Sequence, residues 1–260
     1  MTSFADSGGV RIAWEESGSG TPVLLTHGLG YARWGWEPLA APLAEHHRVI
    51  MFDNRGIGES DVPAGPYTVR LMMQDAVAVL DAVGVDRAHV VGTSLGGMVA
   101  QELAAAHPER VGRLVLMSTT PGGGDAHPMP AVTVELLARA ATMAPVDALR
   151  AFVENALGEE PDQAVVDRIL AHRLANLQDP AGWQAQAAAG TTFDPGDLEI
   201  RVPTLILHAS EDRVVDVRNA ELLGSKIAGS HVVTMPGGHL MFWEDPANVI
   251  QLITNFLEPT

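Results

Sequence analysis

The sequence contains no cysteine and only one lysine, Lys226. The lack of cysteine excludes disulfides, thiolate metal ligands and a cysteine nucleophile. Basic residues are also scarce, because 16 of them stand against 32 acidic residues and leave a net charge of −16 at pH 7. Nucleic acids and anionic membranes are bound by clustered basic side chains, and this chain has no basic run. We therefore expect neither a nucleic-acid nor a membrane partner.

Long apolar runs are missing as well. No stretch approaches the roughly 20 apolar residues that a membrane-spanning helix needs. Residues 1–6 have neither the basic start nor the apolar core of a secretory signal, so a cytoplasmic location is the expectation. The histidines are scattered, apart from the neighbours His46 and His47, and no dinucleotide-binding glycine motif follows a strand. We expect no metal and no cofactor.

Short apolar segments recur along most of the chain and alternate with helical patterns. They predict strands at residues 22–26, 48–52, 88–91, 113–117, 203–207 and 231–235, after an antiparallel strand at 10–16. The segments are apolar throughout, which is typical of strands covered by helices on both faces. The fold class is therefore α/β with a mainly parallel sheet.

This alternation stops after Thr119. Residues 130–190 carry four helical patterns and no convincing strand, and the strand pattern resumes at Pro203. We expect residues 1–120 and 197–260 to form an α/β core. Residues 121–196 are expected to form a helical lid inserted into it.

The sequence Gly92-Thr93-Ser94-Leu95-Gly96 lies between an expected strand and an expected helix. In this context Gly-x-Ser-x-Gly is typical of a nucleophile elbow, a sharp turn that presents a serine hydroxyl at the end of a sheet. A glycine-rich turn with Ser94 as an ordinary helix cap is the alternative.

A nucleophilic serine needs a base and an acid, which follow it in the order Ser, Asp or Glu, His in such folds. His239 is the expected base, because it alone among the later histidines lies in a loop just past the last strand. Asp212 is the expected acid, with Glu211 and Asp216 as alternatives. Asp216 also suits the cap of the following helix.

The reaction also needs donors for an oxyanion, and backbone N–H groups serve well. We expect these from Leu95, directly after the serine, and from Leu29 in the loop His27-Gly28-Leu29-Gly30. The His27 side chain is expected to be structural. Candidate pocket residues are apolar and lie near the elbow or in the lid, although each also suits core packing: Trp34, Met98, Met129, Met143 and Trp183.

These motifs together resemble the α/β-hydrolase fold family over essentially the whole chain. The matching features are His27-Gly28, Asp53-x-Arg55-Gly56-x-Gly58-x-Ser60, the serine motif with Gly97, Asp212 and Gly238-His239. Residues 61–68 and 107–116 resemble the branch that holds 3-oxoadipate enol-lactonases, small esterases and cofactor-free haloperoxidases. Ala209 and Asp216 depart from the glycine and proline that many members carry.

The resemblance implies a serine hydrolase that cleaves a small apolar carboxylic ester or a lactone through an acyl-enzyme on Ser94. The same triad also serves carbon–carbon bond hydrolases and cofactor-free haloperoxidases or perhydrolases. A ligand sensor on the same fold is a non-enzymatic alternative. Ester against lactone, acyl length and oligomeric state stay open at this stage.

Overall fold

The computed structural model describes residues 2–196 and 199–258. Its strands are β1 (Ser3–Ser7), β2 (Val10–Ser17), β3 (Thr21–Thr26), β4 (His47–Phe52), β5 (Ala88–Thr93), β6 (Val111–Met117), β7 (Thr204–Ala209) and β8 (His231–Met235). These strands form one eight-stranded sheet in the order β1-β2-β4-β3-β5-β6-β7-β8 within the described residues. The β1–β2 and β2–β4 pairs are antiparallel, and the other pairs are parallel. The α/β class with a mainly parallel sheet is confirmed.

The helices follow the strands along the chain. They are α1 (Glu37–Ala44), α2 (Val69–Ala82), α3 (Leu95–Ala106), α4 (Ala131–Ala140), α5 (Pro145–Asn155), α6 (Gln163–Ala175), α7 (Pro180–Thr191), α8 (Arg218–Lys226), α9 (Met241–Glu244) and α10 (Pro246–Leu257), with 3₁₀ turns η1 (Arg33–Trp36) and η2 (Pro108–Arg110). Among residues 2–196 and 199–258, no helix is long and apolar enough to cross a membrane.

Both faces of the central part of the sheet, from β3 to β7, are buried over most of their length. Along β3, Leu24 packs into a cluster with α2, α3 and α8, whereas Val23 and Leu25 pack into a second cluster with α1 and α10. Successive strand residues point to opposite faces, so a strand between two helical layers must be apolar at every position. This is why the central strands are continuous apolar runs in the sequence.

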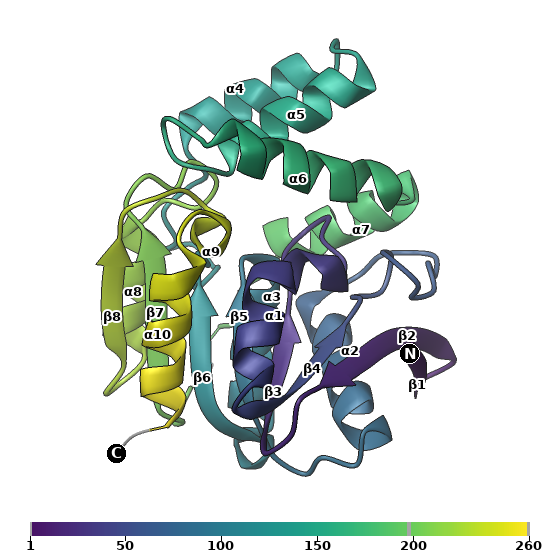
Figure 1. Cartoon of the computed structure of the whole chain (residues 1–260), viewed down its shortest axis with the longest axis vertical. Helices are drawn as coiled ribbons and strands as arrows, with labels where there is room; N and C mark the ends of the chain where they lie inside the picture. Colours follow the sequence, from purple (N-terminus) through teal and green to yellow (C-terminus); the bar gives the residue numbers. More distant parts are fainter. Residues whose placement is uncertain (1, 197–198, 259–260) are drawn as a thin grey trace.

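Helices α4 to α7 lie between β6 and β7 in the sequence and beyond the carboxyl ends of the parallel strands (Figure 1). We call α4 to α7 the helical insertion. Residues 197 and 198, where the core was expected to resume, lie outside the described residues, as do positions 1, 259 and 260.

Candidate active site

The chain turns sharply at Ser94, between the end of β5 and the start of α3. Ser94 has φ 54° and ψ −122°, a backbone conformation that side-chain-bearing residues rarely adopt. The turn is held by the Ser94 N–H, which donates to Met117 O at 2.9 Å, and by the Thr119 hydroxyl, which donates to Ser94 O at 2.7 Å. From residue 90 to residue 104, Ser94 is the one position that is not buried.

The two glycines of the serine motif occupy places where a side chain does not fit. A Cβ on Gly96 would lie 2.0 Å from the Thr26 carbonyl oxygen, because α3 begins against the end of β3. A Cβ on Gly92 would lie 2.5 Å from the Gly96 carbonyl oxygen. The glycine spacing thus follows from the close approach of strand and helix backbones on both sides of the turn.

The loop after β3 lies against Ser94. A Cβ on Gly28 would be 2.9 Å from Ser94 Cβ and 3.4 Å from its Oγ. The N–H groups of Leu29 and Leu95 make no hydrogen bond with any described residue. Both expected donors therefore lack a partner among the described residues, and the N–H of Leu95 also lies at the positive end of the α3 dipole.

The side chains of Asp212 and His239 are joined directly. Asp212 Oδ2 lies 2.8 Å from His239 Nδ1, while Oδ1 accepts the N–H groups of Val214 and Val215 at 2.8 Å each. Burial opposes ionisation of Asp212, but His239 and His208 hold the pKa of its carboxyl well below the usual range. An ionised Asp212 requires the proton of His239 on Nδ1, which leaves Nε2 as an acceptor.

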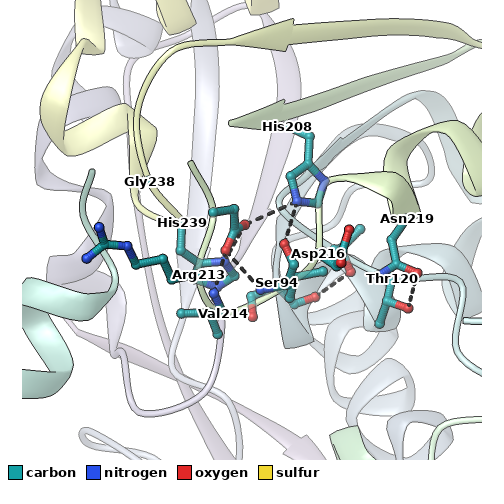
Figure 2. Close-up of polar contacts among 12 residues, drawn as sticks. Ser94, Thr120, His208, Arg213, Val214, Asp216, Asn219, Gly238 and His239 are labelled. Carbon is teal, nitrogen blue, oxygen red and sulfur yellow. Dashed lines mark hydrogen bonds and ion pairs between the residues drawn. The ribbon is translucent and has the colours of Figure 1, made fainter. Parts of the chain in front are cut away.

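Ser94 and the His239 ring lie beside each other in Figure 2. The Ser94 hydroxyl makes no hydrogen bond, to His239 or to another group, within the part of the chain that the structure describes. Catalytic hydrogen bonds are often long in unliganded enzymes and tighten when substrate binds, so this geometry is compatible with proton transfer.

The other two carboxylates near Asp212 point elsewhere. Exposed Glu211 accepts the N–H of Glu159 at 2.9 Å. Asp216 accepts the N–H of Arg218 at 2.9 Å and pairs with its guanidinium at 2.6 Å. Of the three candidate acids, Asp212 is the one that the structure places on His239. Asp216 precedes α8 as expected, but Val217 occupies the cap position itself.

Two further groups at this site were not assigned a role from the sequence. His208 Nε2 lies 3.1 Å from both Asp212 Oδ2 and the Val215 carbonyl oxygen. Glu244 accepts the N–H of Gly238 at 2.7 Å and that of Gly158 at 2.8 Å, which ties the His239 loop to the helical insertion. Neither residue stands in a local motif, so only the tertiary fold reveals the contacts.

The His27 side chain is packed rather than open to the site. Its Nδ1 accepts the Gly28 N–H at 2.7 Å, and its ring stacks on Tyr31 with centroids 4.7 Å apart. Burial lowers the pKa of His27 to about 3, so the folded protein holds this ring neutral. These contacts agree with a structural role for the side chain.

Two of the five candidate pocket residues, Met129 and Trp183, line separate cavities. Met98 is buried in the core beside Leu95, and Trp34 stacks on His172 with centroids 5.0 Å apart. Trp183 lines a cavity of about 300 Å³, whereas Met129 lines a separate cavity of about 550 Å³. Neither of these two cavities is lined by Ser94, Asp212 or His239, and Met143 lines neither of them.

No group of three or more His, Asp or Glu side chains that could hold a metal ion occurs in the described segments 2–196 and 199–258.

Comparison with known proteins gives concordant matches. The profile of the alpha/beta hydrolase fold family matches residues 21–246. A 2-hydroxy-6-oxononadienedioate/2-hydroxy-6-oxononatrienedioate hydrolase of Paraburkholderia xenovorans is 31% identical over 268 residues, which cover 96% of this chain and 91% of that protein.

Solved structures also superpose on nearly the whole chain. A hydrolase from Pseudomonas aeruginosa superposes with a TM-score of 0.84 at 32% identity, over 98% of both chains. An esterase from Exiguobacterium antarcticum has a TM-score of 0.88 at 26% identity, over 99% of this chain and 100% of the other.

Proposed function

Because the chain belongs to the alpha/beta hydrolase fold family, we propose that it cleaves a carboxylic ester or a lactone through an acyl-enzyme on Ser94. Ser94 Oγ attacks the acyl carbon while His239 Nε2 takes its proton. The tetrahedral oxyanion accepts the N–H groups of Leu29 and Leu95. His239 then protonates the leaving alkoxide and afterwards activates the water that releases the acid.

The observation that carries this proposal is the 2.8 Å contact between Asp212 Oδ2 and His239 Nδ1. It supplies the tautomer in which Nε2 can accept the serine proton, and it stabilises the imidazolium that follows. The strained, partly exposed Ser94 and the two free N–H groups beside it supply the other required parts. The esterase among the structural relatives supports ester hydrolysis in particular.

We further propose that the helical insertion acts as a lid that shapes the substrate site. Gln186 in α7 donates to the Arg55 carbonyl oxygen at 2.7 Å, and its Oε1 accepts the Gly30 N–H at 3.4 Å. A Cβ on Gly190 would lie 3.4 Å from the Leu95 side chain. The carboxyl-terminal half of α7 therefore covers both the loop at residues 27–30, which holds one of the proposed oxyanion donors, and the start of α3.

The test is hydrolysis of p-nitrophenyl butyrate by three variants. Ser94→Ala should abolish turnover, and Asp212→Asn should lower kcat by about 10⁴, because His239 loses the partner that fixes its tautomer. Asp216→Asn is the matched control, a neighbouring carboxylate paired with Arg218, and should stay within about twofold of the parent.

A fluorophosphonate probe should label the parent at Ser94, as located by peptide mass spectrometry. The proposal fails if Ser94→Ala retains the parent rate or if the label resides on another serine. Equal losses in Asp212→Asn and Asp216→Asn would remove the assignment of Asp212.

A further inference from the structure

His208 is a buried polar side chain to which the reaction proposed above gives no role. It stands one residue before the end of β7, and its side chain is 0% exposed. Ile206, on the same face of the strand, packs in the apolar core. The His208 Nδ1 atom has no hydrogen-bond partner among the described residues, and a buried polar atom without a partner costs free energy. The contribution of this histidine must therefore come from its other ring nitrogen.

That nitrogen, Nε2, lies 3.1 Å from Asp212 Oδ2 and 3.1 Å from the Val215 carbonyl oxygen (Figure 2). The Asp212 carboxyl is ionised: burial opposes this, but His239 and His208 hold its pKa well below the usual range. Both neighbours of Nε2 are then acceptors, so Nε2 carries a proton and is the donor. His208 thus connects β7 to the turn that holds the proposed catalytic acid.

With His208 included, each oxygen of the Asp212 carboxylate accepts two hydrogen bonds. Oδ1 accepts the N–H groups of Val214 and Val215 at 2.8 Å each. Oδ2 accepts His239 Nδ1 at 2.8 Å and His208 Nε2 at 3.1 Å. A carboxylate offers about four acceptor positions, so all of them are used. Without His208, His239 alone would bind Oδ2.

We propose that His208 is a positioning residue for the reaction: its Nε2–H holds Asp212 Oδ2 on His239 Nδ1 and limits how strongly that oxygen stabilises the His239 imidazolium. This inference rests on the function proposed above. A donor on a carboxylate oxygen draws charge toward itself and so weakens the attraction of the same oxygen for a second donor. Loss of the His208 donor should therefore loosen the carboxylate and let His239 retain its proton to higher pH.

The experiment compares two replacements of similar shape. His208→Gln keeps an N–H donor at a similar reach, whereas His208→Met places an unbranched side chain of similar length there without a donor. With p-nitrophenyl butyrate, His208→Met should lower kcat by about tenfold and leave KM within about twofold, because the interaction acts on proton transfer. The acidic midpoint of kcat/KM should rise by about half a pH unit. His208→Gln should restore most of kcat and return the midpoint toward that of the parent.

The acidic limb can be assigned to His239, because its titratable neighbours stay constant over that range or are shared by the variants. Burial lowers the pKa of His27, which interacts with His239 through charge, to about 3. Glu244 accepts the N–H of Gly238 and is present in every variant compared. A second proton on His208 would lie on Nδ1, where no described residue accepts it.

His47→Met and His47→Gln are the matched controls. His47 is also a buried strand histidine, but it begins β4, at the end of the sheet opposite to Ser94. Both variants should keep kcat within about twofold of the parent and leave the acidic midpoint unchanged. Urea unfolding shows whether each variant is folded under the assay conditions. A fall in kcat at an unchanged acidic midpoint in His208→Met, or equal kcat in His208→Met and His208→Gln, would overturn the proposal and leave His208 a packing role.

NMR of the parent labelled with ¹⁵N-histidine provides a second readout that needs neither a substitution nor turnover. The ring-nitrogen shifts should show the proton of His208 on Nε2, and a proton on Nδ1 alone would overturn the proposal. The resonance of the His239 Nδ1 proton should move in His208→Met and stay in place in His47→Met. If the parent cleaves the ester through Ser94 and His208→Met matches it in kcat and acidic midpoint, only this inference fails. If the NMR results are as expected but the parent cleaves no ester, the proposed reaction is wrong.

Discussion

Replacing Ser94 by glycine should stabilise the protein while it abolishes activity. Ser94 adopts φ 54° and ψ −122°, where a residue with a Cβ costs about 1 to 3 kcal/mol. Glycine removes that cost, but it makes the unfolded chain more flexible, which lowers the free energy of unfolding by about 0.5 to 1 kcal/mol. The Ser94 hydroxyl makes no hydrogen bond within the described residues, so little else is lost. The midpoints of these two ranges leave an expected net gain of about 1 kcal/mol.

Ser94→Ala separates backbone strain from the loss of the hydroxyl. Alanine keeps the Cβ and therefore the strain, so its free energy of unfolding should match that of the parent within about 0.5 kcal/mol. Both variants should be inactive. Urea unfolding measures the difference as a higher midpoint for Ser94→Gly at an unchanged m value.

Ser225→Gly is the control for the direction of the effect. Ser225 is exposed near the end of α8, at ordinary helical angles, so glycine should destabilise there by about 0.5 to 1 kcal/mol. A Ser94→Gly variant that is no more stable than Ser94→Ala would show that a Cβ at position 94 causes no backbone strain, which would contradict this prediction.

Two other predictions concern buried ionisable groups. Asp75→Ala should lower the free energy of unfolding in urea by about 3 to 5 kcal/mol, because it leaves the buried Arg55 guanidinium without the carboxylate that it contacts twice at 2.6 Å. The double variant Arg55→Met with Asp75→Leu should recover most of that loss. His27, with its pKa lowered by burial to about 3, is neutral when folded, but the unfolded chain protonates it below about pH 6.5. Stability should therefore fall by up to about 1.4 kcal/mol per unit as pH drops from 6.5 toward 3, and a shallower slope is expected for His27→Gln; an unchanged slope would contradict this.

The central part of the fold could be predicted because its signals are local. Strands β3 to β7 are apolar on both faces, and the elbow follows from the two glycines beside Ser94. Strand β1 was missed, since it lies at the sheet edge, where Phe4 is 45% exposed and no apolar run forms. Helix α9 was missed because four residues are too few for a helical period to show.

The residues of the site also divide into those that local sequence predicts and those that only the tertiary fold reveals. The position of Asp212 could be predicted from its distance past β7, and the structure places it on His239. The contact of His208 with Asp212 could not be predicted, because it depends on how the turn after β7 folds back. In the sequence, His208 has the features of an ordinary strand residue.

The helical insertion and the core share the loops on which the proposed chemistry depends. Glu244 links Gly238, next to His239, to Gly158 in the loop after α5, and the Leu240 N–H donates to Ala156 O at 2.9 Å. Thr133 in α4 donates its hydroxyl to the carbonyl oxygen of Arg213, next to Asp212. A displacement of α4 or α5 would therefore shift the Asp212 and His239 loops together. Substitutions at these contacts should therefore change kcat as well as KM.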